Sequence, residues 1–306
     1  MAPEDVAIDH SGRVYFSDYG GNRVFQFLPD GSVHVVAGTG TSGETGDGGP
    51  AVEATMLGPA GLTFNSAGDL LIAEHDGGRI RRVDAHGIIT TFAILSPLPA
   101  QGEHPSSYPV GLAAASDGSV WVGEEGDGLV RSVDDAGITT GFFGAPIPGE
   151  AFRPGYLALD TAGNLYVADR ATVQRTGCRI VRFGRDPPQV IAGTGQCGYS
   201  GDGGPATAAQ LDDPNGLAFD AAGNLYVADS NNERIRRIDE HGIITTVAGT
   251  GVASTFGDGG PATKARLASP FGIAIARRGL LYIAEGVGKR IRVLNLSSGI
   301  ITTAAT

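Results

Sequence analysis

The chain has 306 residues, of which 41% are hydrophobic, and a formal net charge of −11. This composition allows a sizeable packed core and excludes a disordered, low-complexity chain. The acidic balance argues against nucleic acid as a partner, because phosphate groups are repelled, and the apolar runs are shorter than the roughly 18–20 residues of a membrane helix. Residues 1–5 lack the basic and apolar regions of a signal peptide, so none is expected.

Six similar segments follow one another along the chain, with a period of roughly 50 residues that is typical of propellers and arrays. They begin at Pro3, Pro59, Pro109, Pro154, Pro214 and Pro270. Each is expected to form four short strands, which in the fifth segment read GLAFD, NLYVAD, RIRRID and IITTVAG. The first is a continuous apolar run, as in a buried strand, and the third alternates apolar and basic residues, as in a half-buried strand.

These strands predict an all-β fold, a six-bladed β-propeller of four-stranded antiparallel blades that forms a single domain over residues 1–306. The blades are expected at approximately 3–58, 59–108, 109–153, 154–213, 214–269 and 270–306. The first blade begins with its inner strand and the sixth ends with its outer strand, so packing between these two blades is expected to close the ring.

The repeated pattern P-x-G-[LI]-A…G-N-L-Y-V-A-D…N-x-R-I resembles the NHL repeat family over essentially the whole chain. The fourth and fifth segments match it best, and the third is the most divergent. The resemblance implies a six-bladed propeller of bacterial type. NHL propellers mostly serve as binding platforms, but relatives include sensor domains of bacterial receptor kinases, RNA binders, and lyases or hydrolases that use the central channel, so the fold does not decide the function.

The motif GDGGPA occurs at residues 46–51, 201–206 and 257–262, each time shortly after an AGTG. No lysine follows the glycines as a phosphate-binding loop requires. We therefore expect a structural connection between neighbouring blades, in which Pro-Ala-x-x-Ala forms one short helical turn. Calcium binding by Asp47, Asp202 or Asp258 is the weaker alternative, because each loop offers one carboxylate and Ca²⁺ takes about six to eight oxygen ligands.

The second strand of every blade ends in an acidic residue, and in most blades an arginine begins the third strand. The acids are Asp18, Glu74, Glu124, Asp169, Asp229 and Glu285, and the arginines are Arg23, Arg79, Arg179, Arg234 and Arg290. We expect each pair to join its hairpin, because arginine binds a carboxylate with two parallel hydrogen bonds. In the third blade Leu129 replaces the arginine, so Glu124 is predicted to lack its partner and to face water, a metal or a ligand.

Departures from the repeat cluster in the second to fourth blades, at the end where the central channel should open. Carboxylates with histidines could serve as acid, base or metal ligands there, for a divalent ion such as Zn²⁺ or Ca²⁺. The candidate catalytic residues are Glu74, His75, His104 and Glu124, and His75, His104 and Glu124 are the candidate metal ligands. The candidate ligand-binding residues are Asp5, Glu103, Tyr108, Glu125, Arg153, Tyr156, Asp169, Arg170, Asn215 and Phe271.

Two functions therefore stay open. The first is a non-catalytic binding or sensor propeller, a monomer that needs no cofactor and binds a protein, a glycan or a small molecule on the channel-mouth face of blades two to four. The second is a lyase or hydrolase at the channel mouth, assisted by a metal. The sequence contains no HExxH, CxxC or GxSxG motif that would favour the second.

Cys178 and Cys197 flank two predicted strands of one hairpin, CRIVRF and PQVIAG. The start of the first strand lies near the end of the second, so a disulfide is favoured over two free thiols. A disulfide in turn favours an oxidising, extracytoplasmic compartment, secreted or periplasmic.

Overall fold

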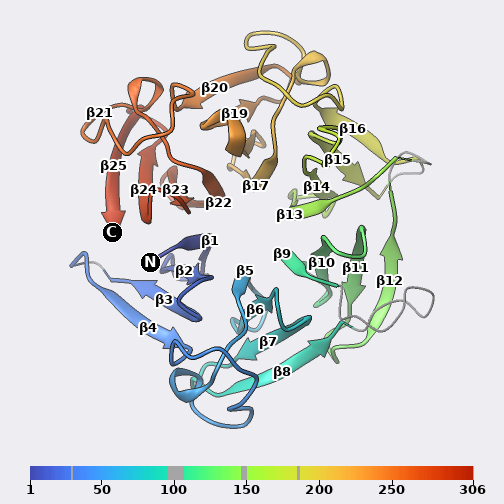
Figure 1. The fold of residues 1–306 in the computed structure, drawn as a ribbon, viewed down its shortest axis with the longest axis vertical. Coiled ribbons are helices and arrows are strands. Elements are labelled where there is room, and N and C mark those ends of the chain that lie inside the picture. Colours follow the sequence, from blue (N-terminus) through green and yellow to red (C-terminus); the bar gives the residue numbers. More distant parts are fainter. Residues whose placement is uncertain (29, 96–106, 146–149, 185–186, 306) are drawn as a thin grey trace.

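The computed structural model describes residues 1–28, 30–95, 107–145, 150–184 and 187–305. In these residues six antiparallel sheets surround a central axis (Figure 1), and each sheet is built from consecutive strands of the chain. The strand that begins at the repeated proline lies nearest the axis in each sheet, and the outermost strands lie at the rim. The prediction of a six-bladed propeller is confirmed.

The first three blades contain twelve strands, and each inner strand begins at one of the repeated prolines. Blade one has β1 (Pro3–Ile8), β2 (Val14–Asp18), β3 (Arg23–Phe27) and β4 (Val33–Ala37). Blade two has β5 (Pro59–Phe64), β6 (Leu70–Glu74), β7 (Arg79–Val83) and β8 (Ile89–Ile94). Blade three has β9 (Pro109–Ala114), β10 (Val120–Glu124), β11 (Leu129–Val133) and β12 (Thr139–Phe143).

Blades four to six repeat this order. Blade four has β13 (Pro154–Leu159), β14 (Leu165–Asp169), β15 (Arg179–Phe183) and β16 (Gln189–Ala192). Blade five has β17 (Pro214–Phe219), β18 (Leu225–Asp229), β19 (Arg234–Ile238) and β20 (Ile244–Ala248), with the 3-10 turn η3 (Ser230–Asn232) after β18. Blade six has β22 (Pro270–Ala276), β23 (Leu280–Glu285), β24 (Arg290–Asn295) and β25 (Ile300–Ala305).

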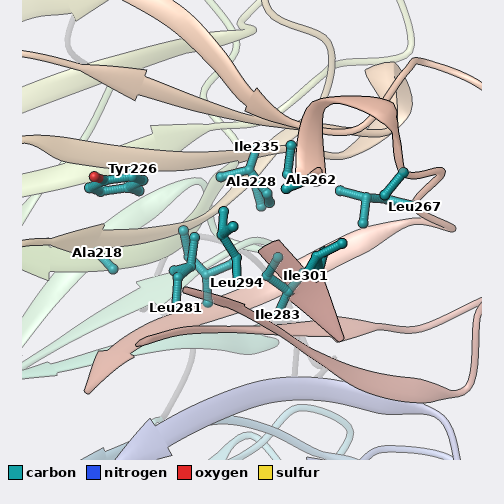
Figure 2. Close-up of a cluster of buried hydrophobic side chains, with 13 residues drawn as sticks. Ala218, Tyr226, Ala228, Ile235, Ala262, Leu267, Leu281, Ile283, Leu294 and Ile301 are labelled. Carbon is teal, nitrogen blue, oxygen red and sulfur yellow. The ribbon is translucent and has the colours of Figure 1, made fainter. Parts of the chain in front are cut away.

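The core consists of hydrophobic clusters between neighbouring blades. Figure 2 shows the cluster between blades five and six, where Tyr226 and Ile235 face Leu281 and Leu294. A similar cluster joins blade six to blade one, and its fully buried Phe16 lies with Ala284 and Ile291. Packing of this kind therefore closes the ring beside the two chain ends (Figure 1).

The inner strands approach one another closely because most of them carry the glycine of P-x-G. A side-chain Cβ at Gly61 would lie 2.2 Å from the Val110 carbonyl oxygen, and one at Gly111 would lie 2.5 Å from Tyr156 Cα. Backbone at this distance from a neighbouring blade leaves no room for a side chain. The two blades without this glycine carry Asp5 and Tyr156 in its place.

Each GDGGPA motif connects two blades and also covers the outer strand of the following blade. The three copies form the turns η1 (Ala51–Glu53), η2 (Ala206–Ala208) and η4 (Ala262–Lys264), as the sequence predicts. Before η4, the short strand β21 (Gly260–Pro261) pairs with the rim strand β25. The first glycine is required, because Gly201 has φ +90° and a Cβ there would lie 2.6 Å from Ala209 Cα.

The aspartate of each GDGGPA motif binds a fully buried arginine of the blade that it covers. Asp47 pairs with Arg81 at 2.6 Å, Asp202 pairs with Arg236 at 2.9 Å, and Asp258 pairs with Arg292 at 2.8 Å. The three arginine side chains are 0% exposed. The same ion pair therefore recurs in three blades and gives each of these aspartates a structural partner.

The expected pairs of strand-two acid and arginine form in three blades. Glu285 binds Arg290 at 2.7 Å, Asp169 binds Arg179 at 2.8 Å, and Glu74 binds Arg79. The expectation is wrong for blades one and five. There Arg23 and Arg234 donate to the carbonyls of Thr39 and Thr250. Asp18 accepts from the N–H groups of Ala2 and Gly21, and Asp229 binds Arg236 at 3.1 Å in place of Arg234.

The prediction that Glu124 lacks a partner is also wrong. Arg131 donates hydrogen bonds to both carboxylate oxygens of Glu124, one of them at 3.0 Å from Arg131 Nη2. Arg131 stands two residues after Leu129 on β11, and residues two apart in a strand lie on the same face, so its side chain reaches the same carboxylate. Glu124 is therefore part of the hairpin clamp, by which we mean a buried strand-two acid bound to an arginine of strand three.

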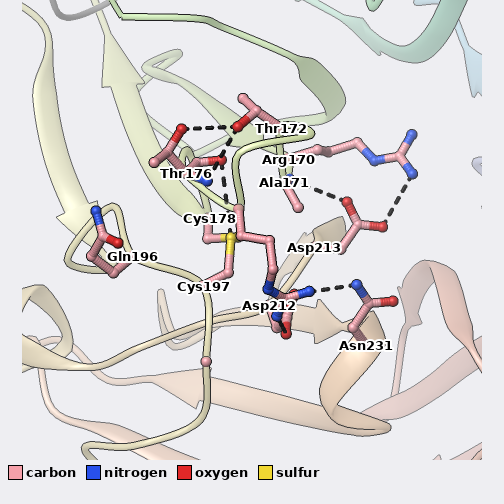
Figure 3. The surroundings of a disulfide bond; sticks show 12 residues. Arg170, Ala171, Thr172, Thr176, Cys178, Gln196, Cys197, Asp212, Asp213 and Asn231 are labelled. Carbon is pink, nitrogen blue, oxygen red and sulfur yellow. Dashed lines mark hydrogen bonds and ion pairs between the residues drawn. A yellow bond between two sulfur atoms is a disulfide. The ribbon is translucent and has the colours of Figure 1, made fainter.

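Cys178 and Cys197 form the predicted disulfide, with their Cα atoms 5.2 Å apart (Figure 3). The bond joins the segment before β15 to the segment after β16 in blade four. In the part of the chain that the structure describes, no helix is long and apolar enough to cross a membrane.

We predict that Arg131→Met lowers the free energy of unfolding by about 3–5 kcal/mol, because it leaves the Glu124 carboxylate buried without its partner. Arg13→Met is the matched control. It removes an ion pair to Asp9 in which the arginine side chain is 60% exposed, so its cost should stay below about 1 kcal/mol. Urea unfolding at neutral pH measures both values, and equal losses would contradict the clamp.

Candidate binding site at the channel mouth

Two positions in each blade surround the mouth of the central channel. One is the residue after the first proline of strand one, and the other is the residue directly after the strand-two acid. They lie at the same end of the blade because the start of strand one pairs with the end of strand two, as Pro59 does with Glu74. The first set is Glu4, Ala60, Val110, Gly155, Asn215 and Phe271, and the second is Tyr19, His75, Glu125, Arg170, Ser230 and Gly286.

Members of both sets from blades one to four line a cavity of about 130 Å³, which we call the mouth cavity. Its lining residues are Glu4, Tyr19, Ala60, His75, Val110, Glu125 and Arg170. The sequence placed the candidate site on blades two to four, and the cavity extends it to blade one. Larger cavities lie between blades one and two and beside the disulfide, away from these residues.

Tyr156 and Asp5, which replace the P-x-G glycine, are buried side chains of the inner strands of blades four and one. The Tyr156 hydroxyl of blade four donates to the Glu4 carbonyl oxygen of blade one at 3.3 Å, and these blades face each other across the axis (Figure 1). The Asp5 carboxylate accepts hydrogen bonds from the N–H groups of Val6 and Leu62, both at 2.8 Å. Both side chains are buried, and neither is among the residues that line the mouth cavity.

Burial changes the ionisation of the two acids of β1. It raises the pKa of Glu4 from 4.5 to about 7, although the nearby Arg170 guanidinium acts in the opposite direction. It raises the pKa of Asp5 to about 8, against the two backbone N–H groups that favour the charged form. Among the residues that the structure describes, Glu4 has no ion-pair partner, while its carboxyl lines the mouth cavity.

The arginines at the mouth are already neutralised by neighbouring acids. Glu125 binds Arg153 and also binds Arg170, the latter at 2.8 Å. Arg170 makes a second ion pair with Asp213 at 3.2 Å. Arg153 donates in addition to the Ala171 carbonyl oxygen. With these ion pairs formed, Glu4 is the carboxyl of the mouth cavity that has no ion-pair partner among the described residues.

Aromatic rings form the side of the mouth next to blades one to three. The His75 ring stacks on Tyr108 with a centroid distance of 5.0 Å and meets the edge of Tyr19 at 5.7 Å. His75 Nδ1 lies 2.9 Å from an Asp76 carboxylate oxygen, and the Tyr19 hydroxyl donates to the same carboxylate at 2.9 Å. The site thus combines carboxylates with π faces.

Three candidate residues lie in hairpin clamps and do not line the mouth cavity. Glu74, Glu124 and Asp169 are each 0% exposed and bound to arginines of their own blades. Burial raises the pKa of all three carboxyls, that of Glu124 to about 7. Their carboxylates are committed to the hairpins.

The structure describes two of the three candidate metal ligands, His75 and Glu124. Glu103 and His104 lie outside the described residues. Within the described ranges, the group of His, Cys, Asp and Glu ligand atoms close enough to share an ion consists of Asp212 and the two disulfide cysteines. His75 and Glu124 are not part of such a group there.

Asn215 and Phe271 complete the mouth on blades five and six. Asn215 is buried, and its amide donates to the Ser230 hydroxyl at 2.9 Å. Phe271 is half-buried and lies beside Gly286, where a Cβ would come within 3.0 Å of its ring. Both lie outside the lining of the mouth cavity.

Sequence reasoning missed Glu4, Tyr19 and Asp213. The signal for the first two was present, because they occupy the same repeat positions as Ala60 and His75. Comparing all six blades at both positions, after the first proline and after the strand-two acid, would have identified Glu4 and Tyr19. Asp213 had no such signal, since its role depends on Arg170 of the neighbouring blade.

Comparison with known proteins places the chain among NHL propellers. A family model described as the Teneurin NHL domain matches residues 28–107, 99–256 and 250–306, and one described as Strictosidine synthase-like, N-terminal matches residues 1–24. Teneurin-4 of Mus musculus is 31% identical over 324 residues, which cover 96% of this chain and 10% of that protein. The chain thus spans about a tenth of the length of the teneurins that it matches over most of its length.

Solved structures share the fold at low sequence identity. A catalytically inactive virginiamycin B lyase from Staphylococcus aureus, solved with quinupristin, has a TM-score of 0.62 at 18% identity, covering 99% of this chain and 84% of that one. An auxiliary nutrient binding protein from Bacteroides thetaiotaomicron has a TM-score of 0.70 at 16% identity, covering 99% and 69%. These likenesses establish the fold alone.

We predict that the free energy of unfolding falls as the pH rises from about 4.5 to about 7. In this window folded Glu4 retains a proton that the unfolded chain has released, so raising the pH favours unfolding. Glu4→Gln should reduce that fall by roughly 1–3 kcal/mol, since one pKa unit corresponds to about 1.4 kcal/mol. Urea unfolding at several pH values across this window measures the fall in unfolding free energy. Glu240→Gln, on an exposed turn, is the control. If Glu4→Gln leaves the pH dependence of the unfolding free energy unchanged, the raised pKa of Glu4 is refuted.

Proposed function

Because this chain belongs to the NHL-repeat β-propeller family, we propose that it is a non-catalytic binding module whose channel mouth accepts a cationic group of a protein partner. The observation that carries the proposal is Glu4, a mostly buried carboxyl that lines the mouth cavity and has no ion-pair partner among the described residues. A cation that enters the cavity supplies the missing partner, and it favours the ionised form of this carboxyl.

The charge balance of the mouth supports a cation rather than an anion. Arg153 and Arg170 are both held by Glu125, and Arg170 is held by Asp213 as well. An anion would have to displace one of these carboxylates before it could reach a guanidinium group. The net charge of −11 further favours the approach of basic partners through long-range attraction.

The aromatic side of the mouth supports the same ligand class. Cations are attracted to the faces of tyrosine rings, and Tyr19 and Tyr108 both contact His75 at the channel mouth. Tyr108 is 40% exposed, so its ring is accessible to an incoming group. Tyr19 and Glu4 both line the mouth cavity, whose volume is about 130 Å³, so a guanidinium or ammonium group bound by Glu4 would lie close to the Tyr19 ring.

The disulfide supports an extracytoplasmic partner, because such bonds persist in oxidising compartments. In this setting the propeller would act as a recognition or sensor domain, with a binding face presented to proteins outside the cytoplasm.

The alternative, a lyase or hydrolase at the mouth, would depend on His75. Glu74 and Glu124 are bound in hairpin clamps, so His75 with Asp76 is the pair near the cavity with acid–base chemistry. Its ring is also packed between Tyr19 and Tyr108, which suits a recognition surface. We therefore favour binding.

We test the proposal with agmatine, which carries a guanidinium and an ammonium group. Isothermal titration at pH about 7, in two buffers with different ionisation enthalpies, should detect binding together with release of a fraction of a proton, because the cation ionises Glu4. Glu4→Gln should weaken binding about tenfold and abolish the proton release, and Glu240→Gln should change neither. Absence of binding, or equal affinity in Glu4→Gln, would overturn the proposal.

A further inference from the structure

A second cavity, of about 520 Å³, lies beside the disulfide of blade four. Its polar lining residues are Glu150, Gln174, Thr176, Arg179, Thr194 and Gln196. Of the residues described, none lines both this cavity and the mouth cavity. We call it the blade-four cavity.

The blade-four cavity exists because blade four departs from the repeat. In blades two, five and six the GDGGPA loop covers the outer hairpin and its aspartate binds the third residue of strand three. Blade four carries Val181 at that position, and the segment before it lacks the motif. Glu150 of this segment binds Arg179 instead, at 2.5 Å, and both residues line the blade-four cavity.

The other wall is an insertion fixed by the disulfide. Residues 171–177 lengthen the hairpin between β14 and β15, and Cys178 at its end is bonded to Cys197. The Cys197 N–H donates to the Arg175 carbonyl at 3.2 Å, and Thr176 forms a backbone bridge with Gln196. Figure 3 shows Thr176, the disulfide and Gln196 on these adjoining segments. The wall is therefore held in one conformation, which reduces the entropy cost of binding.

Arg179 is oriented differently from its counterparts in blades one and five. Arg23 and Arg234 donate to the carbonyls of Thr39 and Thr250 at 2.6 and 2.8 Å. Arg179 instead donates to Asp169 and Glu150, although Thr194 is the counterpart of those threonines. Its Nη1 lies 3.6 Å from where a Cβ of Gly195 would stand, and both residues line the cavity.

The chemistry of the lining selects a neutral, hydroxyl-rich ligand. Among the described lining residues the cation, Arg179, is already bound by Glu150 and Asp169, and the anion, Glu150, is bound by Arg179, which disfavours both charged classes of ligand. The amides of Gln174 and Gln196 and the hydroxyl groups of the threonines each provide donors and acceptors, which vicinal sugar hydroxyls match. The volume lies in the range of about 300–1,000 Å³ typical of small-molecule sites. We infer that the blade-four cavity binds a neutral sugar of disaccharide size.

Saturation-transfer NMR with lactose, maltose and N,N′-diacetylchitobiose tests this inference, with citrate and spermidine as charged comparison probes. At least one disaccharide should receive saturation, and the double variant Gln174→Ala/Gln196→Ala should weaken its binding about tenfold through the loss of two hydrogen-bonding side chains. Both side chains are exposed, so the variant keeps the fold.

Gln189→Ala is the matched control, because Gln189 is an exposed glutamine of the same blade that does not line the cavity. It should bind the sugar as the unchanged protein does. The inference is overturned if no disaccharide binds, if the charged probes alone bind, or if Gln189→Ala weakens binding as much as the double variant. Loss of sugar binding in Glu4→Gln would also overturn it, by assigning the ligand to the mouth cavity.

Discussion

The hairpin clamp is the interaction on which the rest of this propeller depends. Burying a carboxylate costs several kcal/mol unless a partner compensates it, and the arginines of strand three provide that partner in most blades. Glu74 and Glu285 each bind two such arginines, and a GDGGPA aspartate adds a further carboxylate to the second of them. The clamp therefore joins strand two, strand three and the connection from the preceding blade. It also fixes the residue that follows the acid at the channel mouth.

The strand-two acid and the residue that follows it have different roles, and this difference indicates which residues are available for binding. A strand-two acid is committed to stability, while its immediate neighbour is free to vary from blade to blade. In blade three the two roles fall on consecutive glutamates, since Glu124 binds Arg131 and Glu125 lines the mouth cavity. Variation at the residue directly after the strand-two acid gives the mouth its mixture of aromatic, acidic and basic groups without disturbing the hairpins.

The sequence was sufficient for the architecture, because the six-fold repetition of apolar runs and turn residues leaves few alternatives. The disulfide could also be predicted, from the positions of its cysteines on one hairpin. The partner of Glu124 could not be predicted from a fixed spacing, because an arginine two residues further along the strand reaches the same carboxylate. The hydrogen bond from Tyr156 to Glu4 across the axis was equally hidden, since the two residues lie 152 positions apart in the chain.

The most direct test of this account compares Glu124→Gln with Glu125→Gln, by measuring for each the free energy of unfolding and the affinity for agmatine. The account predicts that Glu124→Gln lowers stability by several kcal/mol and leaves affinity unchanged, because it breaks a buried clamp. Glu125→Gln should instead weaken binding while stability falls by about 1 kcal/mol or less, since Arg170 keeps its ion pair with Asp213. Similar effects of the two substitutions on both quantities would contradict the separation of clamp and mouth.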